Sequence, residues 1–401
     1  MSPFRDAVEQ ASIPLSLEKI AKSCPRIKHL ELSHRPGCTS SEQFSQRLLK
    51  LLQSLKDLKS LSLNCTCLNE DVIVFLVTHP GLQVLDGRRG LRFQTDRVTA
   101  AMKRVTPAQS FPSLRVLNMH LDKKSIPLLL ANATTLRDLE LTDVSPQAFA
   151  TVGKLRGLTN LTLTLNKRES ATLAYRHLHE LQFLSNLRAL SVRSSIPHIF
   201  GIQNIEQTIT ALASGLPRLE ELELPIYNIF SGKLLETIGT ECPLLHDLRI
   251  VNCMLSQADL ENGQNPLFRQ LKTFEVTTLY VKDQNGRMIW GARSVGDPVN
   301  QSTTMFDHIP EYFQNLNETE DRPYGSSIIE HPLVTEVLAQ SIVDNFPSLR
   351  RFNMSSSCNG PTLTRIFEEL KGLVSLAPQD LPRRSSIYDD EDYMPKWKYD
   401  E

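Results

Sequence analysis

The stretch CPLLHDLRIVNCML, residues 242–255, decides the fold of this chain. Within it, Leu245, Leu248 and Ile250 follow the spacing apolar-x-x-apolar-x-apolar. The last two of these positions are two residues apart, so in an extended strand both side chains point to the same face. The residues between them point to the opposite face. The stretch therefore predicts a short strand with one apolar face turned toward a core.

The same spacing occurs eleven times along the 401 residues. From one copy to the next, the first apolar position advances by 31, 24, 32, 22, 22, 29, 32, 26, 26 and then 78 residues. The copies are Ile27/Leu30/Leu32, Leu58/Leu61/Leu63, Leu82/Leu85/Gly87, Leu114/Leu117/Met119, Leu136/Leu139/Leu141, Leu158/Leu161/Leu163, Leu187/Leu190/Val192, Leu219/Leu222/Leu224, Leu245/Leu248/Ile250, Leu271/Phe274/Val276 and Leu349/Phe352/Met354. All steps but the last lie in or near the period of leucine-rich repeats, which indicates a solenoid of stacked units.

Proline marks the start of six copies, two positions before the first apolar residue. These prolines are Pro25, Pro80, Pro112, Pro217, Pro243 and Pro347. Proline ends a helix and favours an extended chain before it. Segments with helical spacing precede the strands at 15–23, 48–55, 72–77, 205–213, 234–239 and 334–343. Each unit is therefore a helix, a turn and a short strand, and such units stack into an α/β horseshoe with a parallel concave sheet and helices on the convex side.

Cysteine adds a family resemblance to this pattern. Residues 242–255 match L-x-x-L-x-L-x-x-C-x-L throughout, and Cys24-Pro25 opens another unit in the same manner. In this the chain resembles the leucine-rich repeats of the ribonuclease-inhibitor-like superfamily, and especially those of F-box/leucine-rich-repeat proteins. The irregular unit length and the phrase FPSLR at Phe111 and Phe346 are most similar to the fungal F-box-type proteins. The resemblance covers about residues 15–376.

The resemblance implies a function as well as a fold. In F-box/leucine-rich-repeat proteins, the repeats bind the substrate of a cullin-RING (SCF-type) ubiquitin ligase, and an amino-terminal F-box binds the adaptor subunit. Ile13-Pro14-Leu15 is similar to the start of an F-box, but residues 17–32 already form the first repeat. We therefore expect a protein substrate as partner, and the adaptor subunit only if an F-box lies upstream. The alternative is a stand-alone repeat scaffold or regulator unrelated to ubiquitination.

The first repeat opens without a polar capping helix. One end of the apolar core is then poorly covered. We expect this of a chain truncated at its amino terminus, or of an end that a partner or a second copy covers.

The last step of 78 residues divides the chain. We expect a repeat array over 1–280, an insertion over 281–332, a terminal repeat over 333–376 and a disordered acidic and aromatic tail over 377–401. Asn285-Gly286 is a strong signal for a hairpin turn, so the tenth strand is predicted to run long and double back through Met288, Ile289 and Trp290. Trp290, Tyr280 and Phe306 are candidate anchors for a partner, although Trp290 would equally cover the edge of the sheet.

Composition excludes several classes of protein. A net charge of −1 gives no overall pull toward nucleic acid or an anionic membrane, so neither is expected as a partner. No apolar run approaches the length of a membrane span, and the amino terminus does not resemble a secretory signal. Seven cysteines, an odd number, fit thiols in a reducing compartment, which predicts the cytoplasm or the nucleus.

Motifs for catalysis or metal binding are few. The pair Cys65 and Cys67 could form half a metal site, but its place after a predicted strand favours a structural role. His177 and His179 are two residues apart in a helical stretch and are predicted to lie on the surface. The sequence contains no G-x-S-x-G, Walker or G-x-G-x-x-G motif. We expect a non-enzymatic protein with no cofactor, metal or catalytic residue. The alternative is a hydrolase whose catalytic Ser, His and Asp come from distant parts of the sequence.

The strand register names the residues that face the concave side. The candidates for binding a partner are Asp138, Glu140, Thr162, Arg193, Glu221, Glu223, Asp247, Arg249 and Glu275, together with Trp290 of the insertion. Acidic groups recur in the fifth, eighth, ninth and tenth copies, so a partner with a basic patch is favoured. The alternative is a solvated sheet face, which is polar in any protein.

Overall fold

A computed structural model of the full chain describes most of the repeat array. The described residues are 19–20, 23–33, 41–64, 68–87, 92–106, 109–166, 173, 175–194, 204–256, 258–259, 268–282, 288–290, 332–354 and 360–372. The expectations for the F-box-like start, for Cys65 and Cys67, for Phe306 and for the tail lie outside these residues.

The strands and helices alternate along the chain. The strands are β1 (His29–Ser33), β2 (Ser60–Asn64), β3 (Val84–Asp86), β4 (Arg92–Phe93), β5 (Val116–Leu121), β6 (Asp138–Val144), β7 (Asn160–Leu165), β8 (Ala189–Ser194), β9 (Glu221–Ser231), β10 (Asp247–Ser256), β11 (Thr273–Lys282), β12 (Met288–Trp290) and β13 (Arg351–Met354). The helices are α2 (Ser41–Ser54), α3 (Glu70–Thr78), α4 (Thr95–Lys103), α5 (Ser125–Leu130), α6 (Phe149–Val152), α7 (Tyr175–His179), α8 (Ile205–Gly215), α9 (Gly232–Glu241), α12 (Pro332–Asn345) and α13 (Gly360–Leu370), with the 3-10 turns η2 (Pro146–Ala148) and η4 (Glu180–Phe183).

All eleven predicted strands lie in one sheet, in the predicted register. The order is β1-β2-β3-β5-β6-β7-β8-β9-β10-β11, with β13 beside β11, and every one of these pairs is parallel. The central apolar residue of each copy stands opposite that of the next, from Leu30 and Leu61 at one end to Phe274 and Phe352 at the other. The chain is therefore a leucine-rich-repeat solenoid, and the predicted fold is confirmed.

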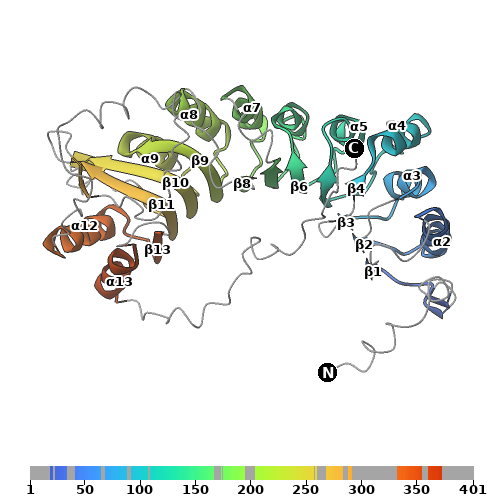
Figure 1. Ribbon diagram of the computed structural model, residues 1–401, viewed down its shortest axis with the longest axis horizontal. Helices are drawn as coiled ribbons and strands as arrows, with labels where there is room; N and C mark the ends of the chain where they lie inside the picture. The colour runs from blue at the N-terminus through green and yellow to red at the C-terminus, as the bar shows by residue number, and fades with distance from the viewer. Residues whose placement is uncertain are drawn as a thin grey trace, which may run out of the picture.

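The sheet lines the inner side of an open arc, and the helices form its outer layer (Figure 1). Five of the six predicted helices, at 48–55, 72–77, 205–213, 234–239 and 334–343, are present as α2, α3, α8, α9 and α12. Of the sixth, at 15–23, the structure describes residues 19–20 and 23, and these are helical. The helical stretch expected around His177 and His179 is present as α7, whereas sequence reasoning missed α4, α5, α6 and α13. Two of these, α5 and α6, have six residues or fewer, too short to show a helical period.

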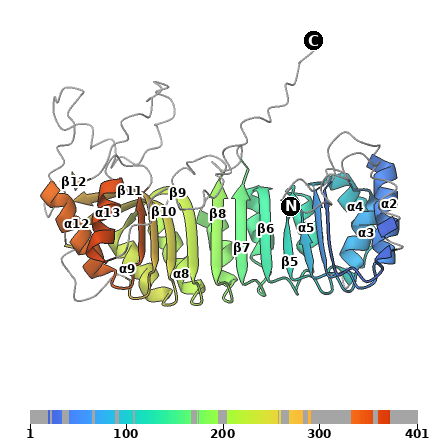
Figure 2. The same ribbon diagram turned by 90° about the horizontal axis from the view of Figure 1, so that it is seen from below.

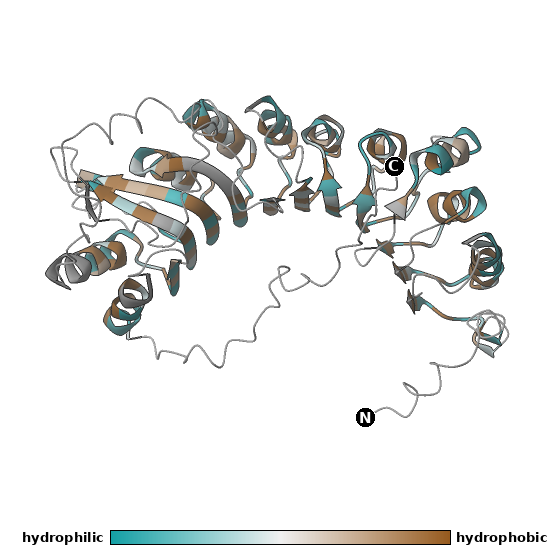
Figure 3. Ribbon diagram, in the orientation of Figure 1, coloured by the Kyte–Doolittle hydropathy of each residue, from teal (hydrophilic) through white to brown (hydrophobic). Residues whose placement is uncertain are grey.

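Leucine fills the space between the two layers. Along β5 the side chains alternate between buried and half-buried, which is the pattern of a strand with one face toward a core. Figure 3 shows bands of hydrophobic and hydrophilic residues along the long strands of the sheet. The carboxyl-terminal end replaces leucine with phenylalanine. Phe274 packs against Phe346 and Phe352, with ring centroids 5.6 Å and 5.9 Å away. Burial of these layers is the main stabilising term, because each layer covers the apolar face of its neighbour.

A turn of five residues leads into each of the eleven strands, and we call these turns together the lower rim. They are residues 24–28, 55–59, 79–83, 111–115, 133–137, 155–159, 184–188, 216–220, 242–246, 268–272 and 346–350. Backbone hydrogen bonds join each turn to the next. The carbonyl oxygen of Lys28, for example, accepts from Lys59 N at 2.8 Å and Ser60 N at 2.9 Å. The bonds repeat up to Lys272 and Arg350, so the lower rim is one continuous edge, at the bottom of Figure 2.

Strands β9 to β11 are much longer than the short strand expected of a repeat, with ten or eleven residues each. The sequence predicted a long strand for β11, which is confirmed, but it predicted short strands for β9 and β10, which was wrong. The pairing of β9 with β10 shifts register between Ile250 and Asn252, which stand opposite Leu224 and Ile229, so β9 contains extra residues in a bulge. Both strands continue beyond the repeat after this bulge. The predicted hairpin is confirmed, since β12 pairs antiparallel with β11 through Val281 and Trp290. No strand of ordinary repeat length would have reached this hairpin.

Cys242 and Cys253 occupy the cysteine positions of the repeat and are buried. The thiol of Cys242 donates to the carbonyl oxygens of Ala213 and Leu216, each at 3.6 Å. Burial raises the pKa of Cys242 to about 12 and also raises the pKa of Cys253. These thiols therefore act as small apolar groups that join neighbouring repeats.

One surface assignment was wrong. His177 is buried and lies near the ring of Phe149, with centroids 6.3 Å apart, whereas His179 is exposed as predicted. Both residues lie in α7, and two successive odd positions of a helix face different directions, so one ring meets the core and the other meets solvent.

Within the described part of the chain, no helix combines the length and apolar character that crossing a bilayer requires.

Candidate functional site

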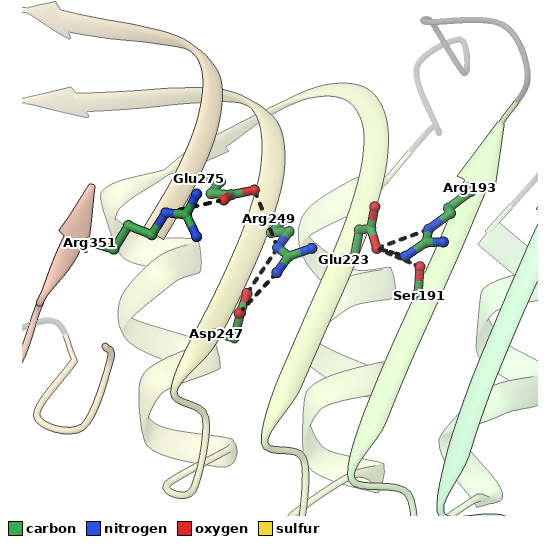
Figure 4. Close-up of polar contacts among 7 residues, drawn as sticks. All are labelled: Ser191, Arg193, Glu223, Asp247, Arg249, Glu275 and Arg351. Atoms are coloured by element: carbon green, nitrogen blue, oxygen red, sulfur yellow. Dashed lines mark hydrogen bonds and ion pairs between the residues drawn. The ribbon is translucent and has the colours of Figure 1, made fainter. Parts of the chain in front are cut away.

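The concave face of β8 to β13 carries a cluster of charged side chains, which we call the concave cluster. Its members are Ser191, Arg193, Glu223, Asp247, Arg249, Glu275 and Arg351 (Figure 4). The parallel register places Ser191, Glu223, Arg249 and Glu275 in one row across neighbouring strands. Because adjacent strands lie about 4.8 Å apart, long side chains of one row can reach each other.

Glu223 is the centre of the first half of the cluster. Its Oε2 accepts hydrogen bonds from Ser191 Oγ at 2.7 Å and from Arg193 Nε and Nη2 at 3.1 Å and 2.9 Å. Burial raises the pKa of this carboxyl, but the bonds from Arg193 and Ser191 outweigh burial, so the net shift is downward. Glu223 is therefore held ionised, and the Arg193 guanidinium is held in one orientation against it.

Arg249 is the centre of the second half. It donates to both oxygens of Asp247 at 3.1 Å, and its Nε lies 3.3 Å from Glu275 Oε2. Arg351 approaches the other oxygen of Glu275 at 4.0 Å. Burial lowers the pKa of Arg249, but the carboxylates of Glu275 and Asp247 outweigh it and raise the pKa. Together with Arg193 and Glu223, these residues place positive and negative groups side by side across five neighbouring strands, β8 to β11 and β13.

Arg351 and Arg193 are the more exposed charged members of the concave cluster, whereas Arg249 is only 29% exposed. The side chains of Arg351 and Arg193 are 56% and 39% exposed, against 27% for Glu223 and 27% for Glu275. Each guanidinium has five N–H donors, and the bonds above use only some of them. The carboxylates hold the guanidinium groups in place, and Arg193 and Arg351 present their remaining donors to the concave space.

The other candidate residues lie on the same face but outside this cluster. Asp138 and Glu140 stand on β6, and Asp138 accepts a hydrogen bond from Asn160 of β7, the strand that also carries Thr162. Glu221 of β9 is exposed. Trp290 lies in β12, beside the far end of β11, and only its backbone is described. The structure therefore joins Arg193, Glu223, Asp247, Arg249 and Glu275 and leaves the rest separate.

Ser191 and Arg351 are the members that the candidate set missed. The strand register already turned both side chains toward the concave side, but it does not show which of the residues on that face bond to one another. Their positions opposite charged residues of the neighbouring strands would have identified them. Ser191 stands directly opposite Glu223, and Arg351 stands one strand away from Glu275 at a diagonal position.

Among the described residues, no group of three His, Cys, Asp or Glu side chains is placed to hold a metal ion. The concave cluster offers charged donors and acceptors in fixed positions, an arrangement suited to recognising charged groups on another molecule.

Comparison with known proteins adds little. No family model matches the chain. No curated protein matches it either. Among solved structures, the chain is similar to one in the crystal structure of the Rad7 and Elc1 complex in yeast, with 18% identity over 66% of this chain and 72% of that one, and a TM-score of 0.36. At this level the similarity adds nothing to what the strand register establishes about the fold.

Proposed function

We propose that this chain is a protein-recognition module that holds a partner on the concave face of β8 to β13, and that it acts by binding rather than by catalysis. The concave cluster carries this proposal. Its charged groups are oriented by one another before any partner arrives, so a partner with complementary charges loses less free energy in ordering them. A face that was merely solvated would gain nothing from such mutual orientation.

The charge balance of the cluster defines the kind of partner. Glu223, Asp247 and Glu275 carry three negative charges, and Arg193, Arg249 and Arg351 carry three positive ones. The carboxylates alone favour a basic patch, as expected from the sequence, but the arginines beside them offset their charge. We propose a protein partner that offers both signs in a matching pattern, so that selectivity comes from position rather than from net charge.

The second part of the proposal concerns the pathway. The cysteine-containing repeats resemble those of F-box/leucine-rich-repeat proteins, and Cys242 and Cys253 are buried at the positions that this repeat type reserves for cysteine. On that resemblance we propose that the bound partner is a substrate of a cullin-RING (SCF-type) ubiquitin ligase in the cytoplasm or nucleus. The alternative is a stand-alone scaffold that holds the same partner without a ligase.

Affinity capture with paired variants tests the recognition surface. We would compare proteins captured from cells by the full chain, by the double variant Arg249→Ala and Glu275→Ala, and by the control Lys233→Ala on the outer helix α9, where the side chain is exposed. At least one partner should be lost by at least tenfold with the double variant and kept with the control. Identical sets from all three proteins would overturn the proposed surface.

A second measurement separates the ligase from the scaffold. The protein would be isolated from its native source and probed for the adaptor and cullin subunits of the ligase. Stoichiometric recovery of both, together with ubiquitination of the captured partner, supports the ligase. Recovery of the partner without either subunit overturns the ligase assignment and leaves the recognition surface intact.

A further inference from the structure

The lower rim has a charge far from that of the rest of the molecule. Its eleven turns contain twelve Lys and Arg residues and two Asp and Glu residues, which gives a formal charge of +10. The whole chain carries −1, so the remaining residues carry −11. The net charge near zero is therefore the sum of two regions of opposite sign. The lower rim can attract a polyanion even though the net charge of the whole chain does not.

The basic side chains of the lower rim are exposed, and almost all are unpaired. All twelve are classed as exposed. Among the residues that the structure describes, a single carboxylate lies within ion-pair distance of any of them: Glu220, 3.4 Å from Arg188. Arg137 instead donates to the carbonyl oxygen of Gly157 at 2.6 Å, and Arg218 to the side chain of Asn186 at 3.2 Å.

Register arranges seven of the twelve in one row. They are Lys28, Lys59, Arg115, Arg137, Arg188, Lys272 and Arg350, each at the position whose backbone forms the hydrogen bonds between turns. Ten steps between strands at about 4.8 Å make this row about 48 Å long. The row follows the inner edge of the arc, along the bottom of Figure 2.

Helix dipoles explain only part of this charge. The lower rim lies where the helices end, and the carboxyl-terminal end of a helix carries about half a negative charge. Even if all eleven turns received such a half charge, the total would be about −5.5, roughly half of the +10 on the side chains. A positive excess remains that no element of the described structure neutralises.

We propose that the lower rim binds single-stranded nucleic acid through its phosphates. A single row of cations matches a linear polyanion, and the row is curved. Duplex DNA has a persistence length of about 150 base pairs and resists following an arc of this size, whereas a single strand follows it freely. Eight of the twelve basic residues are arginine, whose planar guanidinium binds phosphate with two hydrogen bonds.

Recognition at this surface depends on phosphate and not on base identity. Strong readers of single strands stack bases on exposed aromatic rings. Of the aromatic rings in the lower-rim turns, those of Phe111, Phe268, Phe346 and His79 are buried and that of His246 is half-buried, so none is exposed. We therefore expect little preference among sequences and a steep dependence on salt.

Fluorescence anisotropy of a labelled 20-nucleotide oligo(dT) with the full chain tests the proposal. If about six phosphates are neutralised, the slope of log affinity against log salt is about −4, and affinity falls by about 300-fold from 50 to 200 mM salt. An oligo(U) of the same length should bind within about threefold, because the phosphates are the same. Absence of binding to both probes at 50 mM salt would overturn the proposal.

A matched pair of variants locates the surface. The rim variant Lys59→Glu, Arg115→Glu and Lys272→Glu changes three exposed residues of the row, and the control Lys50→Glu, Lys103→Glu and Lys233→Glu changes three exposed helix residues with the same change in net charge. The rim variant should lose at least tenfold in affinity and about two units of salt slope, with the control within about twofold of the parent. Thermal unfolding confirms that both variants fold.

Three further outcomes would overturn the proposal. Equal losses in the two variants would mean that overall charge, and not the row, attracts the probe. A 20-base-pair duplex that binds more tightly than oligo(dT) would contradict the argument from curvature. Vesicles containing phosphatidylserine that compete with oligo(dT) through the same row would identify an anionic lipid surface as the ligand class instead.

Discussion

The concave cluster and the lower rim treat charge in opposite ways. In the concave cluster, three arginines and three carboxylates hold one another in place on five neighbouring strands, β8 to β11 and β13. In the lower rim, twelve basic residues face solvent beside two acidic ones. Paired and half-buried charges have fixed positions and can select a shape, whereas unpaired exposed charges act at a distance and are screened by salt. One repeat therefore contributes to two surfaces with different physical rules.

The largest effect is expected from the layer beneath the concave cluster. Phe274 lies directly before Glu275 on β11, is 1% exposed and packs between Phe346 and Phe352. Phe274→Ala should lower the free energy of unfolding by about 3–5 kcal/mol, because it leaves a cavity. Denaturant unfolding measures this. Phe183→Ala serves as the control, since that ring is 49% exposed, and a comparable loss there would contradict the assignment of the core.

Removing the shared arginine comes next. Arg249→Ala leaves Asp247 and Glu275 without the group that lies between them, and hydrogen bonds to charged groups are worth about 1.5–3 kcal/mol each. With solvent screening included, we expect a loss of about 2 kcal/mol in the free energy of unfolding. Arg115→Ala on the lower rim should change it by less than about 0.5 kcal/mol. Equal changes would remove the distinction between the two surfaces.

Acid should weaken the concave cluster through Glu223. Its pKa lies below the ordinary value of 4.5, so its ionised form contributes stability that is complete above pH 4.5 and is lost as the pH falls through the lower folded pKa. The difference in unfolding free energy between the parent and Glu223→Gln should therefore shrink as the pH is lowered from about 5 to 3. The difference should stay below that for Arg249→Ala. Urea titrations at several pH values measure it, and a difference that grows with acid would contradict the sign.

The smallest effect is expected for the ion pair of the lower rim. Arg188 and Glu220 lie 3.4 Å apart, and the arginine side chain is 60% exposed. Exposed pairs of this kind contribute about 0–1 kcal/mol, and salt screens them. Arg188→Ala should change the unfolding free energy by at most about 0.5 kcal/mol at low salt and by nothing measurable at 1 M salt. A larger, salt-independent loss would mean that this turn belongs to the rigid part of the repeat.

The repeat made much of this fold predictable from the sequence. A spacing repeated eleven times specifies which residues enter the core, and it specifies the register too, because slipping by one position would turn every leucine toward solvent. The short helices α5 and α6 and the long strands β9 and β10 were not predictable in the same way. Their extent depends on packing between neighbours, and His177 is buried for that reason despite its polarity.

The candidate site was predictable in part, because charge pairing needs neighbours across strands. Glu223 and Arg193 are 30 residues apart in the sequence, and Ser191 and Glu223 are 32 apart. In the sequence, each of these residues is indistinguishable from any other polar residue on the solvent face of a strand. The lower rim was hidden for a different reason. Its basic residues occur one or two to a turn in turns that are far apart in the sequence, and acidic residues elsewhere in the chain cancel them in the total charge.

The contact between β11 and β13 shows that the stacking of repeats depends on which strands are adjacent in space and not on their separation in the sequence. Arg350 N and Arg351 N bond to Lys272 O at 2.8 Å and 2.9 Å, the same contacts that Arg137 N and Asp138 N make with Arg115 O at 2.8 Å and 2.9 Å. One pair of contacts spans 78 residues of chain and the other spans 22. An insertion between two repeats therefore leaves their stacking contacts intact and costs little folding free energy. Such insertions give a repeat protein a simple way to gain a new surface during evolution.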